Sequence, residues 1–132
     1  MPDCKVKSAL VLENDPKDIL VALSILRSVG ISDVCSFASS LKAQNFLYDA
    51  LNREAPLPDL LVVDLDLQQE SGYEFIRHWR TVAGLRDIPL IVWSKLGQDH
   101  EQVCEVFHVS CFIPKWKGRE ALESAIREEC FA

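Results

Sequence analysis

The most constraining feature of this sequence is a short apolar run, Leu60 to Val63, that ends at an acid. Pro58 and Asp59 precede the run and Asp64 follows it. Four consecutive apolar residues, two of them β-branched, are typical of a strand buried on both faces of a parallel sheet. Such a strand has no use for a carboxylate in its middle, but parallel sheets place their ligand crevices at the carboxyl ends of the strands. Asp64 therefore either caps the following loop or serves a site at that edge.

The same pattern recurs three times, which favours a shared site. Apolar runs at 9–12, 90–93 and 111–113 are each followed closely by polar residues. If these strands are parallel, their carboxyl ends meet at one edge of the sheet. The residues brought together there are Glu13, Asn14, Asp64, Ser94 and Lys115. Two acids, an amide, a hydroxyl and an ammonium are suited to a hard cation and a phosphoryl group.

Helical patterns fill the intervals between the strands. Asp15 and Pro16 are typical of an N-cap and a first helical residue, and Gly30 is typical of a helix end. We therefore predict a helix between them with an apolar face toward the core. Ser39 or Ser40 is the expected N-cap of a second helix, which ends at 52–54.

The alternation of strands and helices predicts one doubly wound α/β domain over residues 1–132. Its five parallel strands are expected over 7–12, 34–37, 60–63, 90–93 and 111–113. Further helices are predicted after Gly72, over Asp99 to His108, and after Gly118. We predict the flavodoxin-like strand order 2-1-3-4-5 with helices on both faces. In that order strands one and three are neighbours, and the polar residues at their ends lie side by side.

Composition narrows the classes of partner. The formal net charge is −6 and the predicted helices carry mixed signs rather than a basic stripe, so direct nucleic-acid binding is not expected. No apolar run approaches the length that spans a membrane, so no membrane partner is expected. The five cysteines are odd in number and contain no CxxC pair. No disulfide framework is therefore expected, and a reducing, cytoplasmic location is favoured.

The polar strand ends resemble those of the receiver domains of two-component response regulators, and the resemblance covers nearly the whole chain. The matching segments are LVLEND around Glu13 and Asn14, PDLLVVDLDLQQESG around Asp64, IPLIVWS ending at Ser94, and FIPK ending at Lys115. All four occur in the order and at the spacing of that family. The resemblance implies the flavodoxin-like fold and a role in phosphorelay signal transduction.

The resemblance also implies which residues bind the phosphoryl group and the metal. Asp64 would accept the phosphoryl group from a histidine kinase or a phosphotransfer protein. Glu13 and Asn14 fall on the family's acidic pair, which binds Mg²⁺ as the cofactor. The metal would also contact Asp64 and the backbone carbonyl of Asp66.

The remaining matches concern stabilisation of the phosphoryl group and output. Ser94 matches the hydroxyl that hydrogen-bonds a phosphoryl oxygen, and Lys115 matches the family's lysine. Gly72 matches the glycine after the acceptor loop, and Phe112 matches the aromatic switch position. Signalling would pass through the face of the fourth helix, fifth strand and fifth helix, to an output protein or a second copy of the chain. Trp116, in the short loop after Lys115, is expected to be at least partly exposed on that face.

Three positions depart from the family pattern. Asn14 stands where a second metal-binding Asp is usual, so one negative charge is missing. Lys95 follows Ser94 where a small residue usually leaves room for the phosphoryl group. Trp116 follows Lys115 where a proline with a cis peptide bond is usual, which leaves either a reshaped trans loop or a costly cis bond. The alternative function is therefore a module of the same fold that binds partners without phosphotransfer.

An enzymatic alternative is less favoured. The segment Asp64-Leu65-Asp66 also resembles the DxD motif of haloacid-dehalogenase phosphatases. That motif continues with Thr or Val where Gln68 stands here, and the chain has no room for the cap and the remaining acidic motifs. We therefore expect that the chain is not an enzyme.

Overall fold

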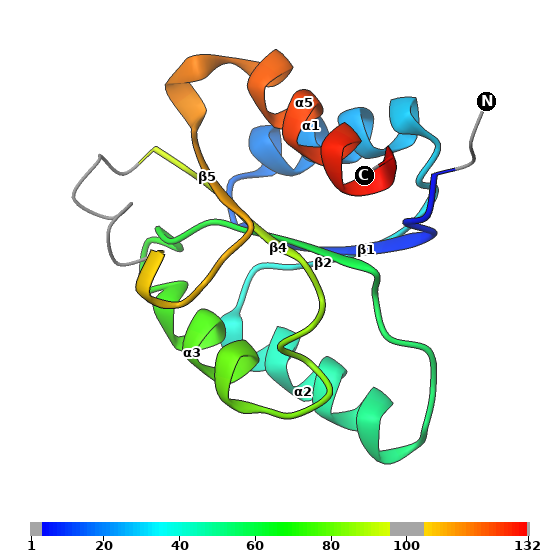
Figure 1. The fold of residues 1–132 in the computed structure, drawn as a ribbon. Helices are drawn as coiled ribbons and strands as arrows, with labels where there is room; N and C mark the ends of the chain where they lie inside the picture. Colours follow the sequence, from blue (N-terminus) through cyan, green and yellow to red (C-terminus); the bar gives the residue numbers. More distant parts are fainter. Residues whose placement is uncertain (1–3, 96–104, 132) are drawn as a thin grey trace.

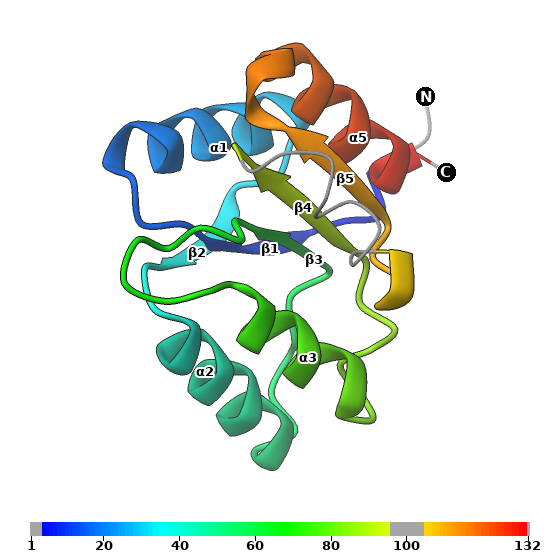
Figure 2. The same ribbon diagram turned by 90° about the vertical axis from the view of Figure 1, so that its left-hand side faces the viewer.

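The computed structural model describes residues 4–95 and 105–131, and it shows a parallel sheet between two layers of helices (Figures 1 and 2). The strands are β1 (Ser8–Leu12), β2 (Asp33–Phe37), β3 (Leu60–Val63), β4 (Leu90–Ser94) and β5 (Cys111–Pro114). The helices are α1 (Pro16–Val29), α2 (Ser40–Asn52), α3 (Tyr73–Thr81) and α5 (Arg119–Phe131), with a 3-10 turn η1 (Lys115–Lys117) before α5. The strand order β2-β1-β3-β4-β5, with every neighbouring pair parallel, confirms the predicted topology.

Both faces of the sheet are covered, which explains the continuous apolar runs. Helices α1 and α5 lie on one face, and α2 and α3 lie on the other (Figure 1). Successive strand residues alternate between the two cores: Val11 and Val62 join the α1/α5 core, whereas Leu12 and Val63 join the α2/α3 core. Because β3 is fully buried, Asp64, the residue that follows it, is the first polar side chain at the carboxyl edge of the sheet.

The predicted helix ends are confirmed in α1 and α2. Asp15 Oδ1 accepts hydrogen bonds from the backbone N–H groups of Lys17 and Asp18, at 2.8 and 3.4 Å. Gly30 has a φ of 105°, the left-handed conformation that favours glycine at a helix end. Ser39, rather than its neighbour, caps α2. Within the described ranges, no helix is long and apolar enough to cross a membrane.

The connection from β5 to α5 has a reshaped trans loop. The described residues contain no cis peptide bond, so the bond between Lys115 and Trp116 is trans, and η1 carries the chain into α5. Trp116 is 71% exposed, as predicted. The helix predicted over Asp99 to His108 falls mostly on residues 96–104, outside the described residues.

The sequence predicts no disulfide framework, but the described residues contain one disulfide. A disulfide connects Cys4, before β1, to Cys130 near the end of α5, and the N–H of Lys5 donates to the Cys130 carbonyl at 3.0 Å. The two cysteines are 126 positions apart, so their spacing gives no signal; only the packing of α5 against the β1 side of the core brings them together. Cys35 and Cys111 are free, and burial raises the pKa of both thiols, that of Cys111 to about 11.

Candidate functional site

The register of β1 and β3 brings two acids together. Leu12 pairs with Val63, and the N–H of Asp64 donates to the Leu12 carbonyl at 2.9 Å. Glu13 and Asp64 are the next residues of these strands, and both are almost wholly buried, at 1% and 2% exposure. The sheet therefore places two carboxylates side by side at its carboxyl edge, as the strand order predicts.

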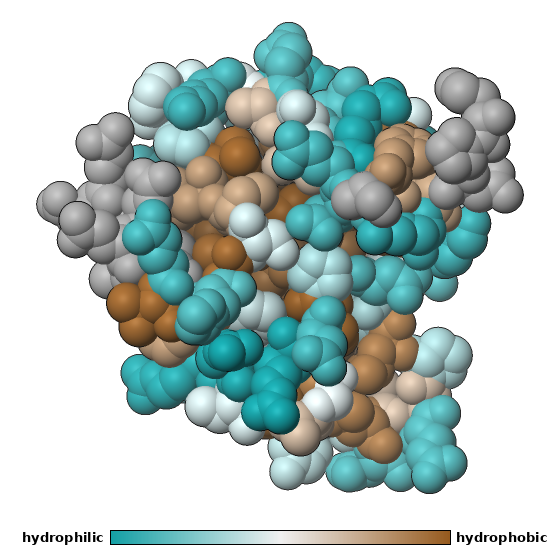
Figure 3. Space-filling model, in the orientation of Figure 1, coloured by the Kyte–Doolittle hydropathy of each residue, from teal (hydrophilic) through white to brown (hydrophobic). Residues whose placement is uncertain are grey.

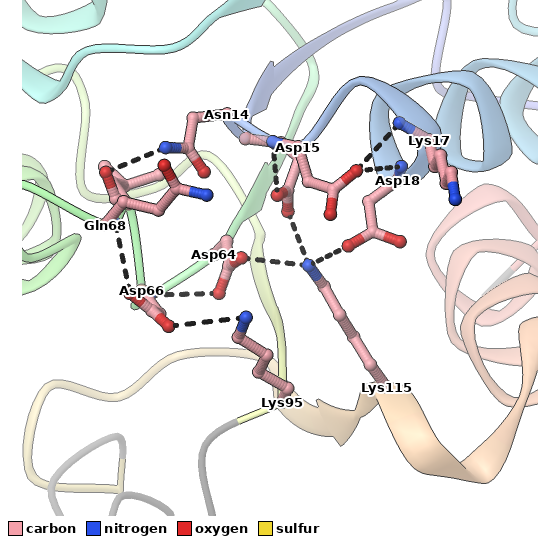
Figure 4. A network of polar contacts seen from close by, with 11 residues as sticks. Asn14, Asp15, Lys17, Asp18, Asp64, Asp66, Gln68, Lys95 and Lys115 are labelled. Carbon is pink, nitrogen blue, oxygen red and sulfur yellow. Dashed lines mark hydrogen bonds and ion pairs between the residues drawn. The ribbon is translucent and has the colours of Figure 1, made fainter.

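Lys115 lies at the centre of the site (Figure 4). Its Nζ lies 2.8 Å from Glu13 Oε2, 2.9 Å from Asp64 Oδ2 and 2.6 Å from Asp18 Oδ2. The same ammonium lies over the ring of Trp93, 4.8 Å from its centroid, in a cation–π arrangement. One ammonium thus links the ends of β1 and β3 to the first turn of α1.

Burial and ion pairing set the charges of this cluster. Burial raises the pKa of Glu13 to about 7; the hydrogen bond from Lys115 opposes this rise, and the neighbouring Asp64 carboxylate adds to it. Burial alone would lower the pKa of Lys115, but its hydrogen bonds to Asp18, Glu13 and Asp64 outweigh burial and raise it. The ammonium therefore stays charged, and the pKa of the Glu13 carboxyl is shifted toward neutral pH.

The loop after β3 fixes the second carboxylate oxygen of Asp64. Asp64 Oδ1 accepts a hydrogen bond from the N–H of Asp66 at 3.0 Å. The loop then returns to the strand end, where the N–H of Gly72 donates to the Leu65 carbonyl at 2.8 Å. A Cβ at Gly72 would lie 2.2 Å from the Asp64 carbonyl oxygen, so only glycine fits here without moving the strand end.

Asn14 and Asp66 lie at the same edge but bond to the loop. Asn14 Nδ2 donates to the Leu67 carbonyl at 2.9 Å, so its Oδ1 is the atom left to face a cation. Asp66 Oδ1 accepts from the N–H of Gln68 at 3.0 Å, and its Oδ2 lies 3.8 Å from Lys95 Nζ. The Asp66 side chain is thus directed to its own loop and to Lys95 (Figure 4).

The donor atoms at this edge fit Mg²⁺ by their chemistry. Mg²⁺ prefers oxygen ligands and binds through one or two carboxylates while it keeps several waters. The carboxylates of Glu13 and Asp64, the amide oxygen of Asn14 and the carbonyl of Asp66 are all oxygen donors. Among the described residues, no three His, Cys, Asp or Glu side chains form a group that would hold a metal by themselves. The two buried carboxylates are bridged by the ammonium of Lys115.

Ser94 and Phe112 lie on the adjacent strands. Ser94 is fully buried at the end of β4 and pairs in register with Pro114 of β5, the residue before Lys115. Phe112 is half-buried opposite Val92 and packs against the α2/α3 core. Both residues therefore lie on the strands predicted from the sequence. The roles that the resemblance to receiver domains implies for them, a phosphoryl-binding hydroxyl for Ser94 and an aromatic switch for Phe112, stay predictions.

Two members of the network were missed from the sequence. Asp18 stands in the first turn of α1, where the helix dipole alone accounts for an acid, so its contact with Lys115 gave no separate signal. Trp93 is buried in β4, and its ring also contacts the Lys115 ammonium. Neither contact follows from spacing, because each joins Lys115 of η1 to a different element.

Comparison with known proteins agrees with this geometry. No family model matches the chain. The response regulator Rcp1 of Synechocystis sp. is 24% identical over 119 residues, which cover 88% of this chain and 81% of Rcp1. The structure of Mn²⁺-bound Rcp1 matches with a TM-score of 0.77 at 22% identity, covering 92% of this chain and 90% of Rcp1. Phosphorylated RcpA, a cyanobacterial phytochrome response regulator, matches with a TM-score of 0.78 at 22% identity, over 93% and 90% of the two chains.

These similarities and the strand order define the class of fold. The chain has the flavodoxin-like fold of receiver domains. Its relatives in sequence and its neighbours in structure are response regulators, so the resemblance indicated by the four sequence segments is confirmed.

Proposed function

We propose that the chain is the phosphoacceptor receiver domain of a two-component response regulator. It takes a phosphoryl group from a histidine kinase or a phosphotransfer protein onto Asp64. The observation that carries this proposal is the environment of the Asp64 carboxylate, which is buried and held at both oxygens. Lys115 Nζ lies 2.9 Å from one oxygen, and the N–H of Asp66 lies 3.0 Å from the other. A carboxylate oriented in this way is suited to act as a nucleophile.

The transfer step uses groups already gathered at the strand ends. An oxygen of Asp64 attacks the phosphorus of a phosphohistidine, the P–N bond breaks, and its electron pair leaves with the imidazole nitrogen. An acyl phosphate forms on Asp64, and its oxygens bring negative charge next to the buried Glu13. The Lys115 ammonium would be the protein's own counter-charge, and we propose that the Ser94 hydroxyl bonds a phosphoryl oxygen, as the resemblance implies. Positioning and charge stabilisation, rather than further covalent chemistry, carry catalysis of such transfers.

The metal belongs to the same proposal. When Mg²⁺ is bound by Glu13, Asn14, Asp64 and the carbonyl of Asp66, it supplies the remaining neutralisation of negative charge. Two structures of similar fold support this: Rcp1 in a Mn²⁺-bound form and RcpA in a phosphorylated form. The chain would label itself and slowly hydrolyse its own acyl phosphate, rather than turn over phosphate esters as an enzyme.

Acetyl phosphate tests the proposal. Incubation with acetyl phosphate and Mg²⁺ should add the mass of one phosphoryl group to the intact protein. The addition should disappear with EDTA and in Asp64→Asn, and beryllofluoride should shift the NMR signals of the residues around Asp64. Multiple turnovers of a chromogenic phosphate ester would instead identify a phosphatase.

A pseudo-receiver that binds partners without phosphotransfer is the second candidate function. Two observations favour it: Asn14 uses its amide nitrogen to hold the acceptor loop, and the Lys95 ammonium lies beside Asp66. This candidate predicts that neither acetyl phosphate nor beryllofluoride changes the wild-type protein. A labelled Asp64 would rule it out.

We further propose that output passes through the surface of β5, η1 and α5 together with the fourth helix. In Figure 3, apolar residues reach the surface over β5, and the residues of that strand from Cys111 to Ile113 are half-buried. Trp116, with the Lys117 ammonium 5.8 Å from its ring centroid, adds exposed aromatic surface beside it. The occupant would be an output protein or a second copy of the chain. We propose that this signalling takes place in the cytoplasm. Reducing conditions there would favour the free thiols of Cys4 and Cys130 over their disulfide.

A further inference from the structure

Asp18 is the member of the Lys115 network that the proposed function leaves without a role. Its Oδ2 lies 2.6 Å from Lys115 Nζ, the shortest of the three ion pairs. Glu13 and Asp64 are almost wholly buried, whereas the Asp18 side chain is 29% exposed. Partial solvation lowers the cost of keeping the Asp18 carboxylate ionised. Asp18 can therefore stay paired with the ammonium whatever cation the buried acids take up.

Helix α1 holds Asp18 rigidly against the turn that carries Lys115. Asp18 is the third residue of α1, and its N–H is bonded to the capping Asp15. Helices α1 and α5 share one core, and Arg119 Nη2 at the start of α5 lies 3.3 Å from Ser24 Oγ of α1. The helix dipole accounts for an acid in this turn. It does not account for a short contact with a lysine 97 residues away in the sequence.

The charges of the cluster give a second reason. Three carboxylates, those of Glu13, Asp18 and Asp64, surround the single ammonium of Lys115, so the group carries a net charge of −2 when all four are ionised. Asn14 departs from a pattern of two metal-binding acids, an acceptor Asp and a lysine. The net charge of that pattern is also −2. Asp18 therefore supplies, on the far side of the ammonium, the charge that is missing at Asn14.

We propose that Asp18 is a positioning residue for Lys115. It holds the ammonium on the α1 side of Asp64, so that Lys115 keeps its position beside Glu13 and Asp64 when these carboxylates also take up a cation. Its effect on phosphorylation rests on the proposed function, but the position of the ammonium is measured without any phosphoryl donor or metal.

The first experiment detects the Lys115 ammonium directly. In metal-free protein labelled with ¹⁵N-lysine, the three carboxylates should slow proton exchange enough to give a resolved Nζ signal, assigned by its loss in Lys115→Met. Asp18→Asn should shift and broaden this signal, and Asp18→Glu should preserve it. Asp15→Asn is the matched control, because it removes a charge three residues away while Asn still serves as an N-cap. An unchanged signal in Asp18→Asn overturns the proposal.

The second experiment measures labelling by acetyl phosphate at saturating Mg²⁺. The rate should fall several-fold in Asp18→Asn, recover in Asp18→Glu, and stay at the wild-type value in Asp15→Asn. In the Lys115→Met background, adding Asp18→Asn should have no further effect, because Asp18 acts through Lys115. A further loss in that background, or equal rates in Asp18→Asn and Asp15→Asn, contradicts the positioning role.

The two experiments keep the proposals apart. If the wild-type protein is never labelled but the ammonium signal moves in Asp18→Asn, the proposed function fails and the positioning role stands. If the wild-type protein is labelled but the ammonium signal does not change in Asp18→Asn, the proposed function stands and the positioning role fails.

Discussion

The site has two sides that differ in how their charges are held. The lysine side, made of Glu13, Asp18, Asp64 and Lys115, has three ion pairs of 2.6 to 2.9 Å around one largely buried ammonium. The loop side comprises Asn14, Asp66 and Lys95. Its side chains bond mainly to the backbone of the loop after β3, and the ion pair between Lys95 and Asp66 is 3.8 Å long with the lysine 65% exposed.

The comparison shows where the departures from the family pattern act. Asn14 and Lys95 both belong to the loop side, whereas the proposed nucleophile Asp64 and its lysine belong to the other. A buried charge cluster changes strongly when one partner is removed, but an exposed pair contributes little. We therefore expect chemistry at Asp64 to depend on the lysine side, and metal affinity and donor access to be tuned from the loop side.

Removal of the ammonium should have the largest effect. Lys115→Met leaves the buried carboxylates of Glu13 and Asp64 without a counter-charge, and losing one partner of a buried ion pair costs about 3–5 kcal/mol. Denaturant unfolding at neutral pH without metal should show a loss of this size, and labelling by acetyl phosphate should become much slower while staying measurable. Lys95→Met removes the same charge on the loop side and should change stability by less than about 0.5 kcal/mol. Equal losses in the two variants would remove the distinction between the sides.

The pH dependence of stability should come next, through Glu13. Its pKa is raised from 4.5 to about 7 in the folded protein, first of all by burial. Its contribution to stability is therefore fully present below pH 4.5 and is lost as the pH rises through 7. In EDTA, the free energy of unfolding of the wild type should fall over this window relative to Glu13→Gln, by at most about 3 kcal/mol. Parallel pH profiles for the two proteins would show that Glu13 keeps an ordinary pKa.

A negative charge restored on the loop side should increase the affinity for Mg²⁺. Asn14→Asp places a carboxylate where the amide now stands, and an added charge near a cation is worth about 1 kcal/mol or more, or about fivefold in affinity. Titration of tryptophan fluorescence with Mg²⁺ should show this gain. Asp15→Asn lowers charge in the same segment and serves as the control. An affinity that is equal or weaker in Asn14→Asp would mean that Asp18 already satisfies the charge requirement of the site.

A smaller effect is expected from the mouth of the site. Lys95 stands directly after Ser94 with its ammonium toward Asp66, so its bulk should slow access of a small donor to Asp64. Lys95→Ala should increase the rate of labelling by acetyl phosphate modestly, with stability changed by less than about 0.5 kcal/mol. Lys95→Met keeps most of the bulk without the charge and separates the two effects. Slower labelling in Lys95→Ala would show that the ammonium attracts the donor instead.

The sequence was sufficient for the features that depend on pattern and order. Apolar runs followed by polar residues predicted the parallel sheet and its edge, and Asp15 and Gly30 predicted the ends of α1. Contacts between elements that are distant in the sequence could not be predicted from it. Asp18 contacts Lys115 only because α1 and η1 meet in space, and Cys4 reaches a cysteine 126 positions away only because α5 returns to the first strand. Such pairs have no fixed spacing, so only the folded chain reveals them.

A small effect on stability is also expected from Trp116, which adjoins the lysine side but points away from it into solvent. It follows Lys115 in η1 and is 71% exposed, so truncation to Ala removes almost no buried surface. The free energy of unfolding of Trp116→Ala, measured by thermal unfolding, should therefore stay within about 1 kcal/mol of the wild type.

The Trp116 ring is large, apolar and next to the lysine proposed to pair with the phosphoryl group. A movement of Lys115 on phosphorylation would therefore carry Trp116 with it. Sedimentation of beryllofluoride-treated protein, or binding of an output partner, should be weaker in Trp116→Ala, while Lys117→Ala tests whether the neighbouring cation is needed. A loss of several kcal/mol would mean that the ring supports the η1 turn itself. If Trp116→Ala changes neither association nor stability, Trp116 does not carry a signal from Lys115 to the surface.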